Sequence, residues 1–286
     1  MKISAIVPTR NSGRTLAACL GSLRHQTHPD VEVIVVDNAS SDDTPALGRR
    51  LAHVFADRGP ERSAQRNWGA ELATGEILVF VDSDMVLEPT VLADIAATFQ
   101  DRPEIGAIIV PERSFGTGFL ASCRVLEKSL SVGQDDVEAP RAFRADLFDL
   151  VGRWDETLTA AEDWDLADRT RAAGVGIARV SSWIWHDEGR ISLRAQFTKK
   201  QYYGQWVAEY LSRRPAARRH LSRPGLLAQA PTLLRSPTRT GGMVVLKGVE
   251  TAGLVVGMRK AHRAGMVGSG RAGTELPGIH PVGVSG

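Results

Sequence analysis

Two carboxylates, Asp82 and Asp84, flank Ser83 directly after the apolar run at residues 77–81. A short run rich in β-branched and aromatic residues is typical of a strand that is buried on both faces. In open α/β sheets, ligands bind outside the carboxyl ends of the strands. Two carboxylates at such a position can share one divalent cation, Mn²⁺ or Mg²⁺, and that cation can bind a diphosphate. The spacing alone is weakly specific, because residues 163–165 repeat it.

The first 111 residues alternate between two kinds of apolar pattern. Continuous apolar runs predict buried strands at residues 3–7, 31–36, 77–81 and 105–110. Helical spacing predicts helices that carry Leu16, Cys19, Leu20 and Leu23, then Leu47, Leu51, Val54 and Phe55, then residues 64–73, and finally Val91, Leu92, Ile95 and Phe99. This alternation predicts βαβ units, and therefore an α/β fold with a mostly parallel sheet flanked by helices.

The pattern becomes less regular after Pro111. We predict an irregular helix over residues 115–132, a polar helix over 162–171 and an aromatic-rich helix over 194–211. Short strands are predicted at 175–180 and 183–185, with His186 directly after the second.

The C-terminal part is basic and apolar. No carboxylate stands between Glu209 and Glu250, whereas this interval holds Arg213, Arg214, Arg218, Arg219, Arg223, Arg235, Arg239 and Lys247. A helical extension over 211–262 with this composition favours peripheral contact with an anionic membrane. A solvated basic face that packs on the domain, or a homo-oligomer contact, is the alternative. The apolar piece at 243–258 is too short to span a bilayer, and the Gly-rich tail at 263–286 is predicted to be disordered.

Composition excludes several classes of protein. The chain has 286 residues, of which 43% are hydrophobic, so one large domain with an appendage can bury an ample core. A net charge of +2 gives no argument for nucleic-acid binding. Two cysteines imply no disulfide framework and fit a reducing cytosol, with Cys19 expected as a buried thiol. The residues before Pro8 are too few for a signal peptide.

Several segments together resemble the family 2 glycosyltransferases. They are residues 3–11 (ISAIVPTRN), 33–44 (VIVVDNASSDDT), 66–69 (RNWG), 73–76 (ATGE), the Asp82-Ser83-Asp84 turn, and 162–166 (EDWDL) with Arg169. Each segment is loose, but their order and spacing over about residues 1–190 are specific. The resemblance implies a GT-A (Rossmann-like) fold, a UDP- or GDP-sugar donor and a divalent metal.

The resemblance also implies roles on the donor side. Pro8, Thr9, Arg10 and Asn11 close the first strand and would edge the nucleotide. Asp37 would accept hydrogen bonds from the base or the ribose, or else form a turn. Arg66 would reach the diphosphate or hold the Asp-x-Asp turn, unless it is a solvated helix residue. In the family the second aspartate contacts the metal and the first faces the ribose, so these roles pass to Asp84 and Asp82, with Ser83 between them.

On the acceptor side, the resemblance gives Asp163 as the general base and Glu162 as the residue that orients the acceptor. Charge matching to the helix macrodipole is the alternative for this pair. One base and no covalent nucleophile imply a single displacement with inversion. His186 is either a third contact to the metal or diphosphate, or a hydrogen-bonded loop residue. Trp154, Trp164, Trp183 and Trp185 could stack on sugars, although core packing is the default.

The chain departs from the family's processive synthases, because it lacks their Q-x-x-R-W segment and their spans. We therefore expect addition of a single sugar to a glycan or lipid-linked acceptor, by an enzyme that is peripheral on the cytoplasmic face of the cell membrane. A nucleotidyltransferase and a non-catalytic, membrane-docked sugar-nucleotide binding protein are the alternatives. A dehydrogenase is disfavoured because no G-x-G-x-x-G follows the first strand.

Overall fold

The computed structural model describes residues 1–134, 137–159, 161–213 and 229–263. Of the tail predicted at 263–286, residues 264–286 lie outside the described residues, as do the basic residues Arg214, Arg218, Arg219 and Arg223. The chain forms two compact units. The first unit comprises Met1–Arg113, Val132–Glu156 and Glu162–Asp187, and the second comprises Ser114–Ser131, Thr157–Ala161 and the chain from Glu188 onward.

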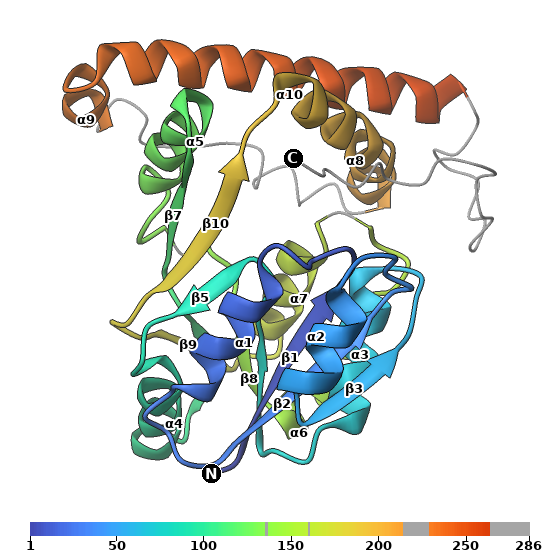
Figure 1. Ribbon diagram of the computed structural model, residues 1–286, viewed down its shortest axis with the longest axis vertical. Helices are drawn as coiled ribbons and strands as arrows, with labels where there is room; N and C mark the ends of the chain where they lie inside the picture. The colour runs from blue at the N-terminus through green and yellow to red at the C-terminus, as the bar shows by residue number, and fades with distance from the viewer. Residues whose placement is uncertain (135–136, 160, 214–228, 264–286) are drawn as a thin grey trace. The chain divides into compact units, whose positions relative to one another are not determined.

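A seven-stranded sheet of order β3-β2-β1-β4-β8-β6-β9 forms the centre of the first unit (Figure 1). Its strands are β1 (Ile3–Thr9), β2 (Val31–Asp37), β3 (Val54–Asp57), β4 (Ile77–Phe80), β6 (Ile105–Ile109), β8 (Ala142–Arg144) and β9 (Gly176–Arg179). Neighbouring strands run parallel, except that β8 is antiparallel to both β4 and β6. The predicted mostly parallel α/β sheet is confirmed.

Successive strand residues alternate between two apolar cores, one on each face of this sheet. Val79 of β4 packs in the core that α1 (Leu16–Arg24) and α4 (Val91–Asp101) cover. The next residue, Phe80, packs in the opposite core with Phe148 and Trp154, at centroid distances of 5.1 and 5.4 Å. The second core is covered by α3 (Arg62–Leu72), α6 (Ala145–Leu150) and α7 (Glu162–Ala172). Burial on both faces explains why the strands are continuous apolar runs.

The predicted helix through Val54 and Phe55 is wrong. Helix α2 (Thr44–Leu51) ends at Ala52, whose backbone is extended, and Val54 pairs with Ile34 as the first residue of β3. A β-carbon at Gly48 would lie 2.5 Å from the Phe55 ring, so this ring packs back onto the helix. Apolar residues on both sides of a tight helix-to-strand connection therefore imitated helical spacing.

Two further expectations are corrected after Pro111. The segment predicted as one helix over 115–132 begins as strand β7 (Glu112–Thr117), turns at Gly118 with φ of 86°, and becomes helical only in α5 (Phe119–Ser129). The short strand predicted at 183–185 extends as β10 (Ile184–Arg190), so His186 lies inside a strand. A second sheet has the order β5-β10-β7, with β5 at Met85–Leu87.

Among the described residues, the second unit contains the helices α5, α8 (Leu193–Arg213), α9 (Ala230–Leu234) and α10 (Pro237–Arg263). Helix α10 packs on α5 and α8 (Figure 1). Two glycines allow its close approach to α8, because a β-carbon at Gly253 would lie 2.5 Å from the Phe197 carbonyl and one at Gly257 2.1 Å from that of Gln201. Helices α5 and α8 thus belong to the same compact unit as the C-terminal helices. The predicted boundaries near residue 111, between donor and acceptor parts, and near residue 210, before the extension, stay predictions.

Helix α10 is longer than the sequence pattern indicated. It begins at Pro237, before the apolar piece predicted at 243–258, and continues for 27 residues. By length and composition alone it could cross a membrane, and it is the only helix of the described residues of which this is true. The expectation that no stretch is long enough is therefore corrected. A core helix of a soluble protein can have the same length and composition.

Candidate active site

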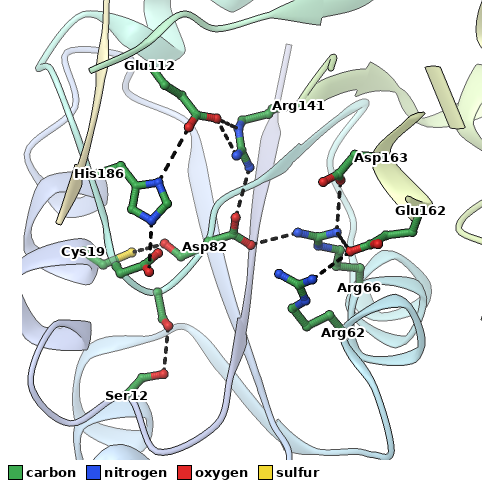
Figure 2. A network of polar contacts seen from close by, with 12 residues as sticks. Ser12, Cys19, Arg62, Arg66, Asp82, Glu112, Arg141, Glu162, Asp163 and His186 are labelled. Atoms are coloured by element: carbon green, nitrogen blue, oxygen red, sulfur yellow. Dashed lines mark hydrogen bonds and ion pairs between the residues drawn. The ribbon is translucent and has the colours of Figure 1, made fainter. Parts of the chain in front are cut away.

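The Asp82 carboxylate at the end of β4 lies between two arginines (Figure 2). Arg66 Nη2 donates to Oδ1 at 2.8 Å, and Arg141 Nη1 donates to Oδ2 at 3.3 Å. Arg66 comes from α3, is buried, and stacks with its guanidinium carbon 4.5 Å from the centroid of Trp154. Burial acts to raise the pKa of Asp82, but the two guanidinium groups hold it far below its usual range. Asp82 is therefore ionised at neutral pH.

Asp84 lies beside His186, which β10 supplies from the second sheet. Pairing of His186 with Met85 in the antiparallel ladder places His186 Nε2 3.1 Å from Asp84 Oδ2. On the other side of the ring, His186 Nδ1 lies 3.7 Å from Glu112 Oε2 (Figure 2). Glu112 in turn accepts from Arg141 Nε at 2.6 Å. A series of contacts through His186, Glu112 and Arg141 thus connects Asp84 to Asp82.

The site's donor set can be tested against a divalent metal. Among the described residues, no three His, Cys, Asp or Glu side chains gather as a complete metal cage. Asp84, whose side chain is 39% exposed, and His186 present one carboxylate oxygen and one imidazole nitrogen. Metals that bind through a few protein ligands complete their shell with substrate phosphates and water. Asp84 and His186 fit such a shared metal, whereas both oxygens of Asp82 already accept from arginines.

Glu162 and Asp163 begin α7 and approach the same arginine. Arg66 Nη1 lies 3.4 Å from Asp163 Oδ1 and 3.8 Å from Glu162 Oε1, and Arg62 Nη2 donates to Glu162 at 3.0 Å. Burial, followed by the negative charge of Asp163, raises the pKa of Glu162. Asp163 has a side chain that is 48% exposed. Arg66 therefore joins the Asp-x-Asp turn to the predicted base.

Of the residues at 8–11 that we predict to contact the nucleotide, two are buried and two are exposed. Pro8 and Thr9 are buried at the end of β1, whereas Arg10 and Asn11 are exposed. Asp37 is also buried, and Oδ1 accepts from Thr9 Oγ1 at 2.8 Å. Ser40 donates to both Asp37 oxygens, at 2.6 and 2.8 Å. These contacts show Asp37 holding the turn between the strand ends, and its contact with a nucleotide stays a prediction.

Side-chain bonds fix the loops around this edge. Asn11 adopts φ of 50° and its Oδ1 accepts from the Ser41 backbone at 2.9 Å. Ser83 shares a 2.8 Å hydrogen bond with the Ser12 hydroxyl. Near the start of α2, Asp42 accepts from the backbone of Gly13 and Thr44, whereas Asp43 at the N-cap position makes no capping bond with its side chain. Asp42, and not the N-cap residue Asp43, therefore supplies the side-chain acceptor at the start of this helix.

Cys19 lies directly behind the Asp-x-Asp turn. It is buried and free, as predicted, and its thiol donates to the Asp82 carbonyl at 3.7 Å. Burial and the charges of Asp84 and Asp82 raise the pKa of this thiol strongly. An unreactive thiol is therefore packed against the loop.

Trp154 follows the default of core packing, whereas Trp183 and Trp185 are half-buried and stack on a cation of the protein. Trp154 is buried in the core beneath Arg66. The Arg113 guanidinium carbon lies 3.9 Å from the Trp183 centroid and 5.7 Å from that of Trp185, so these two rings already stack on a protein cation.

The family model described as Glycosyl transferase family 2 matches residues 4–140. The chain belongs to this family. A PGL/p-HBAD biosynthesis glycosyltransferase of Mycobacterium bovis BCG is 31% identical over 176 residues, which cover 57% of this family 2 chain and 66% of that relative. An uncharacterised glycosyltransferase of Nostoc is 31% identical over 115 residues, or 38% of this chain and 36% of the relative. The chain thus spans between about a third and two thirds of these relatives' lengths.

Solved structures confirm the predicted GT-A fold for this family 2 chain. A mannosyltransferase from Pyrobaculum calidifontis, in complex with GDP-Man and Mn²⁺, is similar with a TM-score of 0.59 and 20% identity, covering 91% of this chain and 87% of that one. S. aureus TarS in complex with UDP is similar with a TM-score of 0.52 and 20% identity, covering 93% and 92%.

Four residues of the family 2 chain's site were missed by sequence reasoning: Arg62, Gln65, Glu112 and Arg141. Buried Gln65 donates to the carbonyls of Thr9 and Val36, which ties the ends of β1 and β2 together. Arg62 precedes Arg66 by one helical turn, so its place on the same helix face could have been predicted. Glu112 and Arg141 are brought to the Asp-x-Asp turn by tertiary structure, and no motif in the neighbouring sequence indicates either residue.

Proposed function

We propose that this protein is an inverting, metal-dependent hexosyltransferase that moves one sugar from a UDP- or GDP-sugar to an acceptor hydroxyl. The observation that carries this proposal is the position of Arg66, which contacts both Asp82 of the Asp-x-Asp turn and Asp163 of α7. A donor-binding group and a candidate base are thereby held in one cluster. The similar mannosyltransferase was solved with GDP-Man and Mn²⁺, and TarS with UDP and with UDP-GlcNAc, which supports the donor class.

On the donor side, Asp84 and His186 would hold the metal. When bound, the metal would neutralise charge that develops on the departing nucleoside diphosphate. A mixed oxygen and nitrogen donor pair favours Mn²⁺ over Mg²⁺, because Mg²⁺ prefers oxygen and water ligands. Asp82 would face the ribose while Arg66 and Arg141 keep it ionised. Arg62, whose side chain is partly exposed, is the cation placed to turn toward phosphate.

On the acceptor side, we assign Asp163 as the general base. Its exposed carboxylate can reach an incoming hydroxyl, and Arg66 Nη1 lies 3.4 Å from its Oδ1. The raised pKa of Glu162 instead suits hydrogen bonding to the acceptor. One base without a covalent nucleophile gives direct displacement and inversion. The position of Glu162 and Asp163 beside Arg66 favours an enzyme over a non-catalytic binding protein. No observation favours a nucleotidyltransferase.

The finer assignments also belong to this proposal. The acceptor would be a lipid-linked or cell-envelope glycan, bound mainly by residues 112–210, with the donor bound by residues 1–111. The extension at 211–262 would place the enzyme on the cytoplasmic face of the membrane. The similar mycobacterial protein is a glycosyltransferase named for PGL/p-HBAD biosynthesis.

Calorimetry tests the donor and metal assignments. The purified chain would be titrated with UDP and with GDP, each in Mn²⁺ and in excess chelator. Tight binding of one nucleotide that is lost in chelator is expected. Asp163→Asn should bind this nucleotide normally and turn over about 10²–10⁴-fold more slowly, since it removes only general-base catalysis. Failure of both nucleotides to bind with Mn²⁺ would refute the metal-bridged donor, and full activity of Asp163→Asn would refute the base.

A further inference from the structure

Helix α10 turns the charged residues of its apolar segment, residues 243–258, toward α5. Within the apolar segment, Lys247 and Glu250 are the two charged side chains, and both pair with α5. Glu250 is buried against Arg124, and Lys247 Nζ lies 3.0 Å from Glu250 Oε2 and also contacts Glu127. Although burial works to raise the pKa of Glu250, Arg124 lowers it to about 2. This face of α10 is therefore committed to ionised contacts inside the second unit.

The opposite face of α10 is apolar and exposed. Val244 and Val245 are 61% and 54% exposed, and Val255 is also exposed. On α10, the other exposed residues between 240 and 258 are small and uncharged, namely Gly241, Gly248, Thr251 and Ala252. Phe119 packs beside Gly242 and is exposed as well. We call the face formed by Val244, Val245, Gly248, Ala252 and Val255 the outer strip.

Both ends of the outer strip are basic. Exposed Arg235 and Arg239 lie before it, and exposed Arg259, Lys260 and Arg263 follow it. Apolar side chains bracketed by cations match the boundary between acyl chains and anionic headgroups. A second copy of the strip would be a poorer partner, because either helix orientation would bring basic ends together.

We propose that the outer strip docks on an anionic phospholipid surface, with α10 lying in the plane of the interface. A spanning orientation would expose the inner face, with Glu250, Lys247 and the α5 ion pairs, to the hydrocarbon interior, where charged groups are rare and unfavourable. In the plane of the interface, that face stays packed on α5 and α8. This docking specifies the membrane contact that the proposed function includes, and it depends on the second unit alone and not on sugar transfer.

Vesicle flotation of the full chain tests this inference without nucleotide. We expect the chain to float with vesicles of 70:30 phosphatidylcholine and phosphatidylglycerol, and to bind pure phosphatidylcholine at least tenfold more weakly. Binding should weaken from about 0.1 to 1 M salt, because the screening length shortens from about 10 to 3 Å. The double variant Val244→Asp/Val245→Asp should lose at least tenfold in partitioning. Leu150→Asp, at a residue of the first unit that is 77% exposed, is the matched control and should float normally.

Three outcomes would overturn the proposal. Equal flotation of the double variant and the control would exclude the outer strip. Resistance of the bound chain to alkaline carbonate extraction would show a spanning helix. A dimer in sedimentation that dissociates in the double variant, without vesicle binding, would show that a second copy covers the strip. Calorimetry with UDP and GDP on the same preparations separates these outcomes from a failure of donor binding.

Discussion

Replacing Arg66 with methionine should destabilise the protein more than any other single change in the site. Arg66 is 1% exposed and contacts Asp82, Asp163 and Glu162. Methionine keeps much of the apolar volume above Trp154 but removes the charge. Asp82 then retains Arg141, and Glu162 retains Arg62. All three carboxylates thus lose the buried cation that they shared, and two of them keep one other arginine.

The expected loss can be bounded from this burial. Removing one partner of a buried ion pair costs about 3–5 kcal/mol, whereas an exposed pair contributes about 0–1 kcal/mol. Arg62→Met is the matched control, because Arg62 lies on the same helix, also pairs with Glu162, and has a side chain that is 43% exposed. For an m-value of about 1–3 kcal/mol/M in urea, Arg66→Met should lower the midpoint by about 1–5 M and Arg62→Met by about 1 M at most.

The loss should also depend on pH in a defined direction. Arg66 lowers the pKa of Asp82 in the folded state, so its stabilising effect is present above the unfolded-state pKa of about 3.9 and is lost as the pH falls below it. The difference in unfolding free energy between wild type and Arg66→Met should therefore be largest near pH 7.5 and smaller at about pH 2.5, below the unfolded-state pKa.

Urea unfolding, followed by tryptophan fluorescence and circular dichroism at both pH values, measures these differences. Equal midpoints for Arg66→Met and Arg62→Met would refute the argument from burial. A loss that is the same at pH 7.5 and at about pH 2.5 would show that packing on Trp154, and not charge, is what Arg66 contributes.

Three further predictions concern other contacts. Glu112→Gln should weaken Mn²⁺-dependent nucleotide binding about 10–100-fold by releasing the orientation of His186, as for other partners of metal-bound histidine; calorimetry that finds unchanged affinity would contradict this. Glu250, with its pKa lowered to about 2 chiefly by Arg124 against the effect of burial, should stabilise the protein by about 3 kcal/mol above pH 4.5 and lose this between pH 4.5 and 2. The gap in unfolding free energy between wild type and Glu250→Gln should therefore close in that window, and a constant gap would argue against it. Cys19 should stay unmodified by a thiol reagent at pH 8 until urea unfolds the chain, and rapid labelling of the native protein would show that the thiol is accessible.

The sequence was sufficient for the elements whose burial leaves a simple pattern. Strands β1, β2, β4 and β6 are buried on both faces, so each appears as a continuous apolar run. The connection after Leu51 failed because Val54 and Phe55 continue a helical spacing by coincidence. Pairing with β2 and packing of Phe55 on Gly48 decide the strand, and both depend on tertiary contacts.

The site shows the same division. Asp82 and Asp84 were predictable because they follow a recognisable strand, and the pair Glu162 and Asp163 because it begins a recognisable helix. Arg141 approaches Asp82 from 59 residues away in the sequence, through the antiparallel strand that it precedes. Such a contact depends on the order of strands in the sheet, which a pattern of residues does not specify.

The glycines between α8 and α10 have a consequence for how this sequence can change over evolutionary time. A β-carbon at Gly204 would lie 2.3 Å from the Leu254 carbonyl, and Gly253 and Gly257 face carbonyls as closely. A backbone carbonyl cannot move aside as a side chain can, so even alanine at these positions would separate the helices. Val244 and Val245 face no such barrier and can be exchanged for other apolar residues. Relatives that keep this helix pair should therefore keep glycine at the three contact positions, whereas the two exposed valines should vary among apolar residues.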